Sequence, residues 1–450
     1  MMRRTDAIRC GGGRRWRWRV ICAALGLFVG WRLFTLAVFW QASTTLTKRG
    51  LPTTLDELDT WYSPQAARTN EAAALEAALN QLSHPKEWPD LIDILNQRCA
   101  EASSIVQENA DGLARLTDIS DAMPCRYSAD LSLGFDAELS HLEPIFNACR
   151  LARVQALDHF AKGNRRDSLD ALGLIVSLAR SLEHEPLLVS HLVQCACART
   201  YVGAIRAILQ HGVLSAPDRD AILRQIDQVE SSLQPSRAYA GECVLVLHSM
   251  RQAHTDHLDT SIIAHPCSFG AVHHLYALSG LRDLDLASLL RLYGETVVAT
   301  SKEYFQARDL LRRIRSRART QPAIHVLARR SHITRIFSGL AKSADVRAKL
   351  RCTRAAVLAL AFAELNGRPP ESLTELQQSS PESVLMDPFV ESPLILKSDD
   401  CAVSIRSVGF ELNNSTDDIV VTVPIQGVKT DNTGVKANDA GVGPKETYAL

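Results

Sequence analysis

Residues 20–40 read VICAALGLFVGWRLFTLAVFW, an apolar run that a single charged residue, Arg32, interrupts. An α-helix needs about 20 apolar residues to cross the hydrocarbon core of a bilayer. The run is long enough, so it predicts a transmembrane helix over residues 20–40 and makes the lipid bilayer the first expected partner. Arg32 costs about 2.5–3.5 kcal/mol at a helix centre, which the many leucine, valine and phenylalanine side chains around it outweigh.

Positive charge is concentrated before this run. Residues 1–19 form a basic segment with seven arginines, whereas Lys48 and Arg49 are the basic residues close behind the run. Positively charged flanks stay in the cytoplasm, so residues 1–19 are predicted inside and the bulk of the chain on the far side of the membrane. Two alternatives stay open: a cleaved signal peptide, for which Phe39–Ser43 offers a poor cleavage site, and a buried core helix.

The rest of the chain has an ordinary globular composition. Its 450 residues carry 50 basic and 50 acidic side chains, and this balance argues against nucleic acid as a partner. Eleven cysteines are scattered without a CxxC pair, so their spacing predicts no zinc site. A location outside the cytoplasm would permit disulfides, but spacing does not define their pairing. The arginines between Arg308 and Arg319 spread around a helix and are interpreted as a solvated face.

Cap motifs mark where helices begin behind the anchor. Residues 41–69 are interpreted as a linker and juxtamembrane segment, polar from 41 to 50. Thr54, with Glu57 three residues later, matches a helix N-cap. Ser215, with Asp218 three residues later and a proline between them, matches another.

Helical periodicity dominates the middle of the chain. Apolar residues between 142 and 233 recur every three or four positions, which is typical of one helical face. Turn signals at Gly163, Pro186 and Gly212 separate successive helices. Each helix must bury its apolar stripe on a neighbour, so residues 70–341 are predicted to form a helical bundle or array without a fixed repeat.

The pattern changes near residue 342. Ala344–Asn366 is predicted to be one long alanine- and leucine-rich helix ended by Gly367, with a short helix after it. Alternation then predicts three strands, namely Leu394–Lys397, Ala402–Val408 and Ile419–Val423. Strands so close in sequence pair as an antiparallel meander, so residues 342–425 are predicted to form a small α+β unit. Residues 426–450 are polar and glycine-rich, which is typical of a disordered tail.

Several motifs of this unit occur in a recognisable order. They are Arg354–Ala361 leading into Asn366–Leu376, then Asp387-Pro388-Phe389, Ser407-Val408-Gly409 and Asp417–Val420. Together they resemble the periplasmic part of the major pseudopilin of type II secretion systems, in which a long helix and two such turns precede an acidic loop. Two features depart from that family: Gly13 is followed by Arg14, and residues 20–40 contain no glutamate. The chain is therefore not expected to be processed or polymerised like a pilin.

The middle of the chain carries a second resemblance. Asn70–Ala73, Cys125–Tyr127 and the run from His141 to Pro186 are similar to uncharacterised, singly anchored bacterial envelope proteins that carry the same pseudopilin-like end. The resemblance implies a single-pass protein of the bacterial cytoplasmic (inner) membrane. Its N-terminus would lie in the cytoplasm and its bulk in the periplasm.

The acidic loop of the pseudopilin-like unit is a candidate calcium site. In the major pseudopilins this loop binds calcium, and Asp417 and Asp418 match the family's acidic pair. The family's earlier aspartate is missing, and Glu411 is the carboxylate nearby. Calcium takes six to eight oxygen ligands, so Asp417, Asp418 and Glu411 are the expected ligands. The alternative is a polar hairpin loop that binds no metal, and no other cofactor is expected.

A second candidate site lies upstream. Histidines gather between His248 and His274, and His254 and His257 would share one helix face. Two imidazoles with a neighbouring carboxylate could hold zinc or iron, although no H-E-x-x-H signature is present. Glu242 lies in an apolar stretch, where burial would suit a carboxylate for acid–base chemistry. The alternative for both features is a polar helix surface.

These patterns favour a membrane-anchored periplasmic binding or scaffolding protein of the cell envelope, with an envelope protein as its partner and no assigned catalysis. One alternative is a metal-dependent, hydrolase-type envelope enzyme centred on Glu242 and the His248–His274 region. Another is an accessory component of a type II secretion-like system, which rests on analogy of fold.

Overall fold

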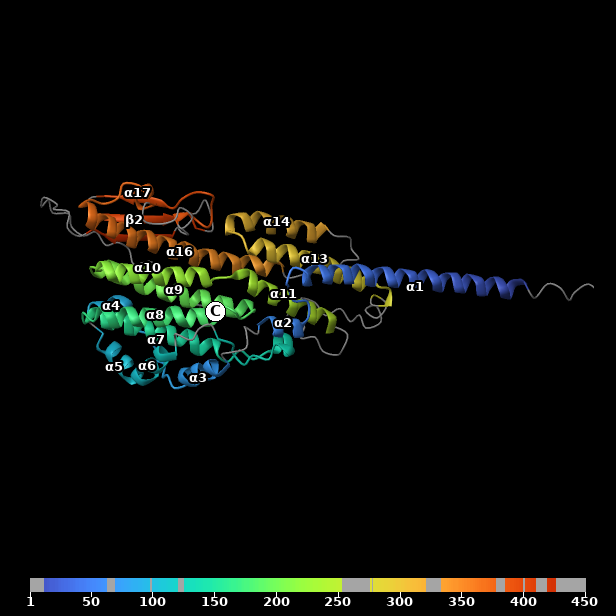
Figure 1. The fold of residues 1–450 in the computed structure, drawn as a ribbon, viewed down its shortest axis with the longest axis horizontal. Helices are drawn as coiled ribbons and strands as arrows, with labels where there is room; N and C mark the ends of the chain where they lie inside the picture. Colours follow the sequence, from blue (N-terminus) through green and yellow to red (C-terminus); the bar gives the residue numbers. More distant parts are fainter. Residues whose placement is uncertain are drawn as a thin grey trace, which may run out of the picture.

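A computed structural model of the chain describes residues 12–62, 69–97, 99–119, 125–252, 276, 278–320, 333–377, 385–399, 401–409 and 419–425. Within these ranges the fold is mainly α, with a three-stranded antiparallel sheet, as the sequence predicts. The helices form an elongated body that carries the sheet towards one end, and helix α1 projects from the other end (Figure 1).

Helix α1, Gly12–Thr47, is one continuous helix of 36 residues in two different surroundings. The side chains from Trp16 to Trp31 are exposed, and the first part of the helix stands clear of the body (Figure 1). Contacts with the body begin at Trp31, whose indole N–H donates to the carbonyl oxygen of Ser279, and from Arg32 onward one face of the same helix packs on the body. The apolar run predicted to cross a membrane is therefore shared between a free segment and a docked one.

The docked part of α1 corrects the predicted linker. Residues 41–47 are not a polar linker but the last turns of the helix. Ala42 and Leu46, four residues apart, are buried and pack with residues of α13, Leu281–Thr300, and of α11, Pro235–Gln252. Tertiary packing of these two side chains therefore outweighs the weak helix propensity of the serines and threonines around them.

Two helices of the described chain are long and apolar enough to cross a membrane, α1 and α9, Leu188–His211. Their surroundings distinguish them, because 78% of the apolar window of α9 is buried inside the protein and only 6% of that of α1. Helix α9 is therefore a core helix of the body, and α1 is the candidate membrane anchor.

The body consists of short helices followed by long antiparallel ones. The short elements are α2 (Leu55–Tyr62), α3 (Thr69–Leu79), α4 (Leu91–Leu95), α5 (Ala100–Glu108), α6 (Ala110–Ile119) and the 3-10 helix η2 (Leu131–Asp136). The long ones, besides α9, α11 and α13, are α7 (Leu142–Ala161), α8 (Arg165–Ser181), α10 (Ala216–Ser232) and α14 (Tyr304–Thr320). Helices α7, α8 and α9 pack against one another, and α10 packs on α8, so the predicted array of successive helices is confirmed.

The predicted cap motifs begin helices in the structure. The hydroxyl of Ser215 accepts the N–H of Asp218, and the Asp218 carboxylate accepts the N–H of Ser215, which forms a capping box at α10. At α2 the hydroxyl of Thr54 accepts the N–H of Glu57 at 3.2 Å. The Glu57 carboxylate reaches back to the N–H of Thr53 at 2.7 Å, one residue before the usual partner in a capping box.

The C-terminal region is built on α16, Ile333–Asn366, which begins well before the predicted start at Ala344. Gly339 lowers helix propensity in the sequence, but in the structure it marks a close helix crossing. A Cβ at this position would lie 2.6 Å from the hydroxyl oxygen of Tyr239 on α11. Glycine is therefore needed inside the helix for the approach of its neighbour.

The sheet follows the short helix α17, Leu373–Gln377, and agrees with the prediction to within one residue at each strand end. Its strands are β1 (Ile395–Ser398), β2 (Ala402–Ser407) and β3 (Ile419–Pro424), in the order β1-β2-β3 with antiparallel pairing. Paired residues such as Val403 with Val423 and Ile405 with Val421 are buried on the face that α16 covers.

One hydrophobic core joins the helical array to the sheet. Its buried side chains run continuously from α3 to β3, and α16 contacts α9, α10 and α14 as well as β2 and β3. The predicted domain boundary between residues 341 and 342 falls inside α16. Helix α16 therefore belongs to both regions at once (Figure 1).

Gly241 makes the tightest backbone contact of a glycine in the described part of the body. A Cβ on Gly241, in α11, would lie 1.5 Å from the carbonyl oxygen of Pro186, in the segment that precedes α9. This obstacle is backbone rather than a flexible side chain, so it cannot move aside cheaply. The pair explains why glycine occurs within the apolar stretch around Glu242.

Gly241→Ala is expected to prevent folding or to lower the free energy of unfolding by about 3 kcal/mol or more, because overpacking a rigid contact is costly. Gly203→Ala in α9 is the matched control, because no atom lies within 4 Å of its new Cβ. Alanine there should stabilise the protein by up to about 1 kcal/mol through helix propensity. Urea unfolding followed by circular dichroism measures both, and equal stability of the two variants would contradict the assigned crossing.

Candidate functional site

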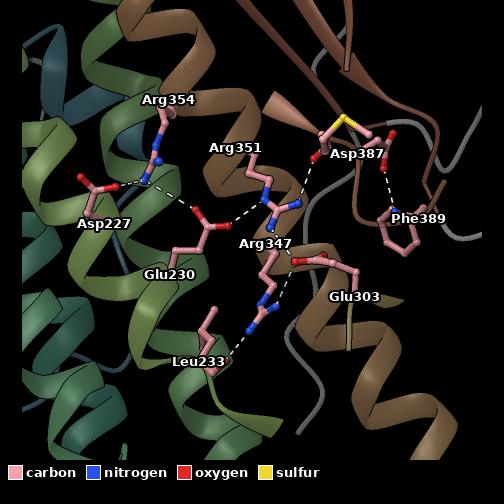
Figure 2. A network of polar contacts seen from close by, with 10 residues as sticks. Asp227, Glu230, Leu233, Glu303, Arg347, Arg351, Arg354, Asp387 and Phe389 are labelled. Carbon is pink, nitrogen blue, oxygen red and sulfur yellow. Dashed lines mark hydrogen bonds and ion pairs between the residues drawn. The ribbon is translucent and has the colours of Figure 1, made fainter. Parts of the chain in front are cut away.

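A polar cleft with a volume of about 740 Å³ opens between α10, α16 and the turn that precedes β1. Three arginines of α16 line it, Arg347, Arg351 and Arg354, together with the acidic residues Asp227, Glu230, Glu303, Asp387 and Glu391. The arginines lie four and three positions apart, so they project from one helix face. Figure 2 shows that the three arginines form one network of ion pairs and hydrogen bonds with Asp227, Glu230 and Glu303. Asp387 lies beside this network.

Arg351 is the centre of the network. Its Nε lies 2.7 Å from Glu230 and its terminal nitrogens donate to Glu303 at 2.9 Å and to the carbonyl oxygen of Met386 at 2.9 Å. Only 7% of the side chain is exposed. Burial lowers the pKa of Arg351, but the carboxylates of Glu230 and Glu303 outweigh it and raise that pKa above the usual value. This guanidinium therefore stays charged and joins three separate segments.

The two neighbouring arginines extend the network in opposite directions. Arg354 pairs with Asp227 and lies 3.6 Å from Glu230. Arg347 donates to the carbonyl oxygen of Leu233, at the end of α10, at 2.6 Å and lies 3.7 Å from Glu303. Arginine suits this position because its fork of donors can serve several acceptors at once.

Asp387 connects the cleft to the sheet. Its carboxylate accepts the N–H of Phe389 and the N–H of Val408, each at 2.9 Å. Burial is the main cause that raises the pKa of Asp387, and these two hydrogen bonds oppose the rise. Asp387-Pro388-Phe389 and Ser407-Val408-Gly409, two motifs of the resemblance, are thus hydrogen-bonded to each other.

The charge balance decides what the cleft can bind. Its described lining carries three cationic and five acidic side chains. Asp227 keeps 65% of its side chain exposed, and Glu391 is exposed as well. These accessible carboxylates favour a ligand that brings ammonium or guanidinium groups over an anion.

The predicted calcium ligands Glu411, Asp417 and Asp418 lie outside the described residues, as does the tail over 426–450. His254, His257 and the other histidines up to His274 also lie outside them. Within the described part of the chain no group of three or more His, Cys, Asp and Glu residues is arranged to hold a metal.

Glu242 and His248 are described, and both lie on α11, where they are half-buried rather than enclosed. The arginines predicted to form a solvated face lie on α14. Among them, Arg312 lies 3.7 Å from Asp309, and Arg317 lies 2.6 Å from Glu295 of α13. Neither group belongs to the lining of the polar cleft.

A second buried polar cluster lies between α7, α8 and the start of α9. Nε2 of His141 and Oε2 of Glu185 are 3.0 Å apart and both side chains are buried. The ring of Tyr127 stacks on His141 with centroids 4.0 Å apart, and its hydroxyl donates to Ser181. Burial, and then the Glu185 carboxylate, raise the pKa of Tyr62 well above its usual value. These contacts tie the helices together.

Sequence reasoning missed both networks as sites. The signal that existed was weak: Arg354, Asp387, His141 and Glu185 all fall in motifs of the resemblance, but nothing in their spacing pairs them. Carboxylates and arginines more than a hundred positions apart, such as Glu230 and Arg351, meet only after folding.

Comparison of the chain with protein-family models gives no match, and comparisons with curated proteins and with solved structures give no significant match. The likeness to the pseudopilins and to the singly anchored envelope proteins therefore stays a prediction. The function has to be argued from the geometry.

Arg351→Leu is expected to lower the free energy of unfolding by about 1–3 kcal/mol, because it removes the hydrogen bonds to Glu230 and Glu303 and leaves them only the more distant Arg354 and Arg347. The double variant Arg351→Leu with Glu230→Leu should recover part of this loss, because it also removes one stranded carboxylate. Arg368→Ala is the control: it breaks an exposed pair with Glu375 and should change stability little. Denaturant unfolding would count against the network if Arg351→Leu behaved like the control.

Proposed function

We propose that this protein is a single-pass membrane protein that holds a rigid binding or scaffolding body at the membrane surface. The observation that carries the proposal is the continuity of α1, which exposes apolar side chains over Trp16–Trp31 and packs on α11 and α13 from Arg32 onward. An anchor that joins its body without a flexible linker fixes the body's distance from the bilayer and its orientation.

The proposed location follows from the charges around the anchor. The arginine-rich segment over residues 1–19 supports an N-terminus in the cytoplasm. The body would then lie in the periplasm of a bacterial envelope, beside the inner membrane. There it would meet envelope proteins.

The proposed binding surface is the polar cleft. Its acidic excess and the exposed carboxylate of Asp227 support binding of a lysine- or arginine-rich segment of a partner. The rigid network around Arg351 would hold this surface in one shape, which lowers the entropic cost of binding.

An accessory role in a secretion system is the second candidate. What supports it is the order of elements at the C-terminus, a long helix packed over a three-stranded antiparallel meander, which the pseudopilin resemblance implies. It rests on likeness of fold and assigns no residue a role in secretion.

The anchor can be tested by placing charge in its free segment. Leu25→Asp with Phe28→Asp adds two carboxylates to side chains that are 63% and 48% exposed, at a cost of about 2.5–3.5 kcal/mol each within a bilayer. The unchanged protein should sediment with membranes after carbonate washing, and the variant should be released. Leu133→Asp with Val213→Asp, at exposed sites of the body, should not be released. Release of the unchanged chain without detergent would reject the anchor.

The orientation of the chain in the membrane can be tested separately, by chemical labelling of the same membranes. A membrane-impermeant maleimide should modify Val213→Cys in intact spheroplasts, because the body is proposed to lie outside the cytoplasm. The unsubstituted chain gives the background from its own exposed cysteines. Labelling that appears only after the membrane is broken would place the body inside.

The polar cleft can be tested with oligolysine as the probe. Asp227→Asn with Glu391→Gln should weaken its binding to the purified full chain by about tenfold at low salt, because two acceptors of the cleft lose their charge. The control Glu101→Gln with Asp111→Asn removes the same charge from exposed sites on α5 and α6. Fluorescence anisotropy measures both. Equal affinities would show that oligolysine binds by net charge alone.

A further inference from the structure

The free segment of α1 is too short for the bilayer it is proposed to cross. Val20 to Trp31 spans roughly 17 Å at 1.5 Å per residue, whereas Val20 to Trp40 spans roughly 30 Å, the thickness of the hydrocarbon core. If the body stayed entirely in water, the free segment of α1 would be about 13 Å shorter than the hydrocarbon core, at a cost of some fraction of a kcal/mol per Å. The rest of the apolar run therefore has to enter the bilayer, together with the part of the body that packs on it.

What is packed on it is the start of α13. Trp31 donates its indole N–H to the carbonyl oxygen of Ser279 at 2.6 Å, and Arg32 pairs with Asp283 at 2.7 Å. Further along, a Cβ on Gly294 would lie 2.7 Å from Leu46. Contacts therefore advance in the same direction on both helices, so α1 and α13 run parallel and their first contacts lie nearest to the bilayer (Figure 1).

Gly280 permits the close approach of α1 to the start of α13. Gly280 has φ +80, and a Cβ there would lie 2.5 Å from both a guanidinium nitrogen of Arg32 and the hydroxyl oxygen of Thr35. Thr35 is fully buried and donates to the carbonyl oxygen of Arg32 at 3.0 Å. Arg32, Thr35 and Asp283 thus face the protein and are hydrogen-bonded within this seam, whereas Nε of the neighbouring Arg282 has no hydrogen-bond partner among the described residues.

The opposite face of the docked segment is apolar and uncovered among the described residues. Leu33, Phe34 and Trp40 are 63%, 54% and 69% exposed, and Leu278, just before α13, is 63% exposed. On α1 these side chains follow directly on the exposed apolar residues of Val20–Trp31. Because those residues are the ones proposed to face acyl chains, this continuity argues that lipid, rather than a protein, covers the rest of the apolar face.

We propose that the tip of the body, residues 278–284 with Arg32–Trp40, is embedded in the leaflet nearest to the body. The proposal rests on the proposed anchor role of α1. Arg32 then lies at membrane depth, where an unpaired charge would be costly, and Asp283 compensates it. The seam makes the anchor and the first turns of α13 one membrane-inserted unit, which sets how deeply the body is seated.

Two equally exposed side chains provide the test. Leu278 and Val213 are each 63% exposed, and Val213 lies in the turn between α9 and α10. The ends of α9 and α10 that this turn joins lie away from α1 (Figure 1). Full-length Leu278→Cys and Val213→Cys are reconstituted in dioleoyl phosphatidylcholine–phosphatidylglycerol vesicles and treated with an impermeant maleimide. Val213→Cys normalises for orientation, and the unsubstituted chain gives the background.

Leu278→Cys is expected to react about tenfold or more slowly than Val213→Cys, since a thiol among acyl chains is hidden from the reagent. In thinner dimyristoleoyl bilayers the protection should fall, because the free segment of α1 then spans a larger share of the membrane. Protection should persist at less than one chain per vesicle. If the protection is lost on dilution, a second copy of the chain rather than lipid covers residue 278, and the proposal is overturned.

The same vesicles distinguish the proposal of an embedded tip from the proposal that α1 is an anchor. If the chain fails to float with the vesicles, α1 is not an anchor. If the chain floats but Leu278→Cys reacts as fast as Val213→Cys, the anchor stands and the embedded tip is rejected. Asp283→Leu provides a second measurement: it should reduce the fraction of chain that floats, and adding Arg32→Leu should restore it.

Discussion

The structure depends on burying α16 on nearly all sides. From Leu350 to Ala359 every residue of this helix is buried, including two arginines. A helix so enclosed has to satisfy every charge it carries, because an unpaired ion in the interior is costly. Glu230 of α10 and Glu303 at the start of α14 supply the counter-charges for Arg351, and the turn at Met386 supplies a carbonyl. The helical array, the sheet and the polar cleft are therefore fixed by the same contacts.

Helix α1 places a second constraint on the fold at the other end of the body. One rigid helix is exposed and apolar from Val20 to Trp31, and it is packed on α11 and α13 along its last turns. The two parts cannot move independently without bending the helix. Any process that positions α1 therefore positions the cleft as well, because the end of α13 lines the cleft.

Much of the architecture was predictable because local signals were strong. Cap motifs at Thr54 and Ser215 and the alternation in three short strands gave element types and ends to within a residue or two. The apolar run over residues 20–40 gave the helix type of α1 but not its ends, because the helix extends from Gly12 to Thr47. The start of α16 was predicted too late, at Ala344 instead of Ile333, and the sequence does not show whether a glycine such as Gly339 breaks a helix or admits a neighbour. Gly339 and Gly241 both lie inside helices for the second reason.

The candidate site was much less predictable. Its motif residues, Asp387 and Arg354 among them, attracted notice as parts of a resemblance, but their partners lie on other elements and have no local signature. A carboxylate such as Glu230 looks like any solvated residue of an amphipathic helix until α16 is packed against it.

The sequence by itself determined the helical class, the antiparallel sheet and the apolar run that nominates a membrane anchor, because periodicity and hydrophobic length act locally. The tertiary structure alone decided that Arg32 meets Asp283, that three arginines share a cleft with five acidic residues, and that α9 is core rather than membrane. These outcomes depend on which faces of the helices pack together. Such faces belong to segments far apart in the sequence, so no local sequence pattern shows how they pair.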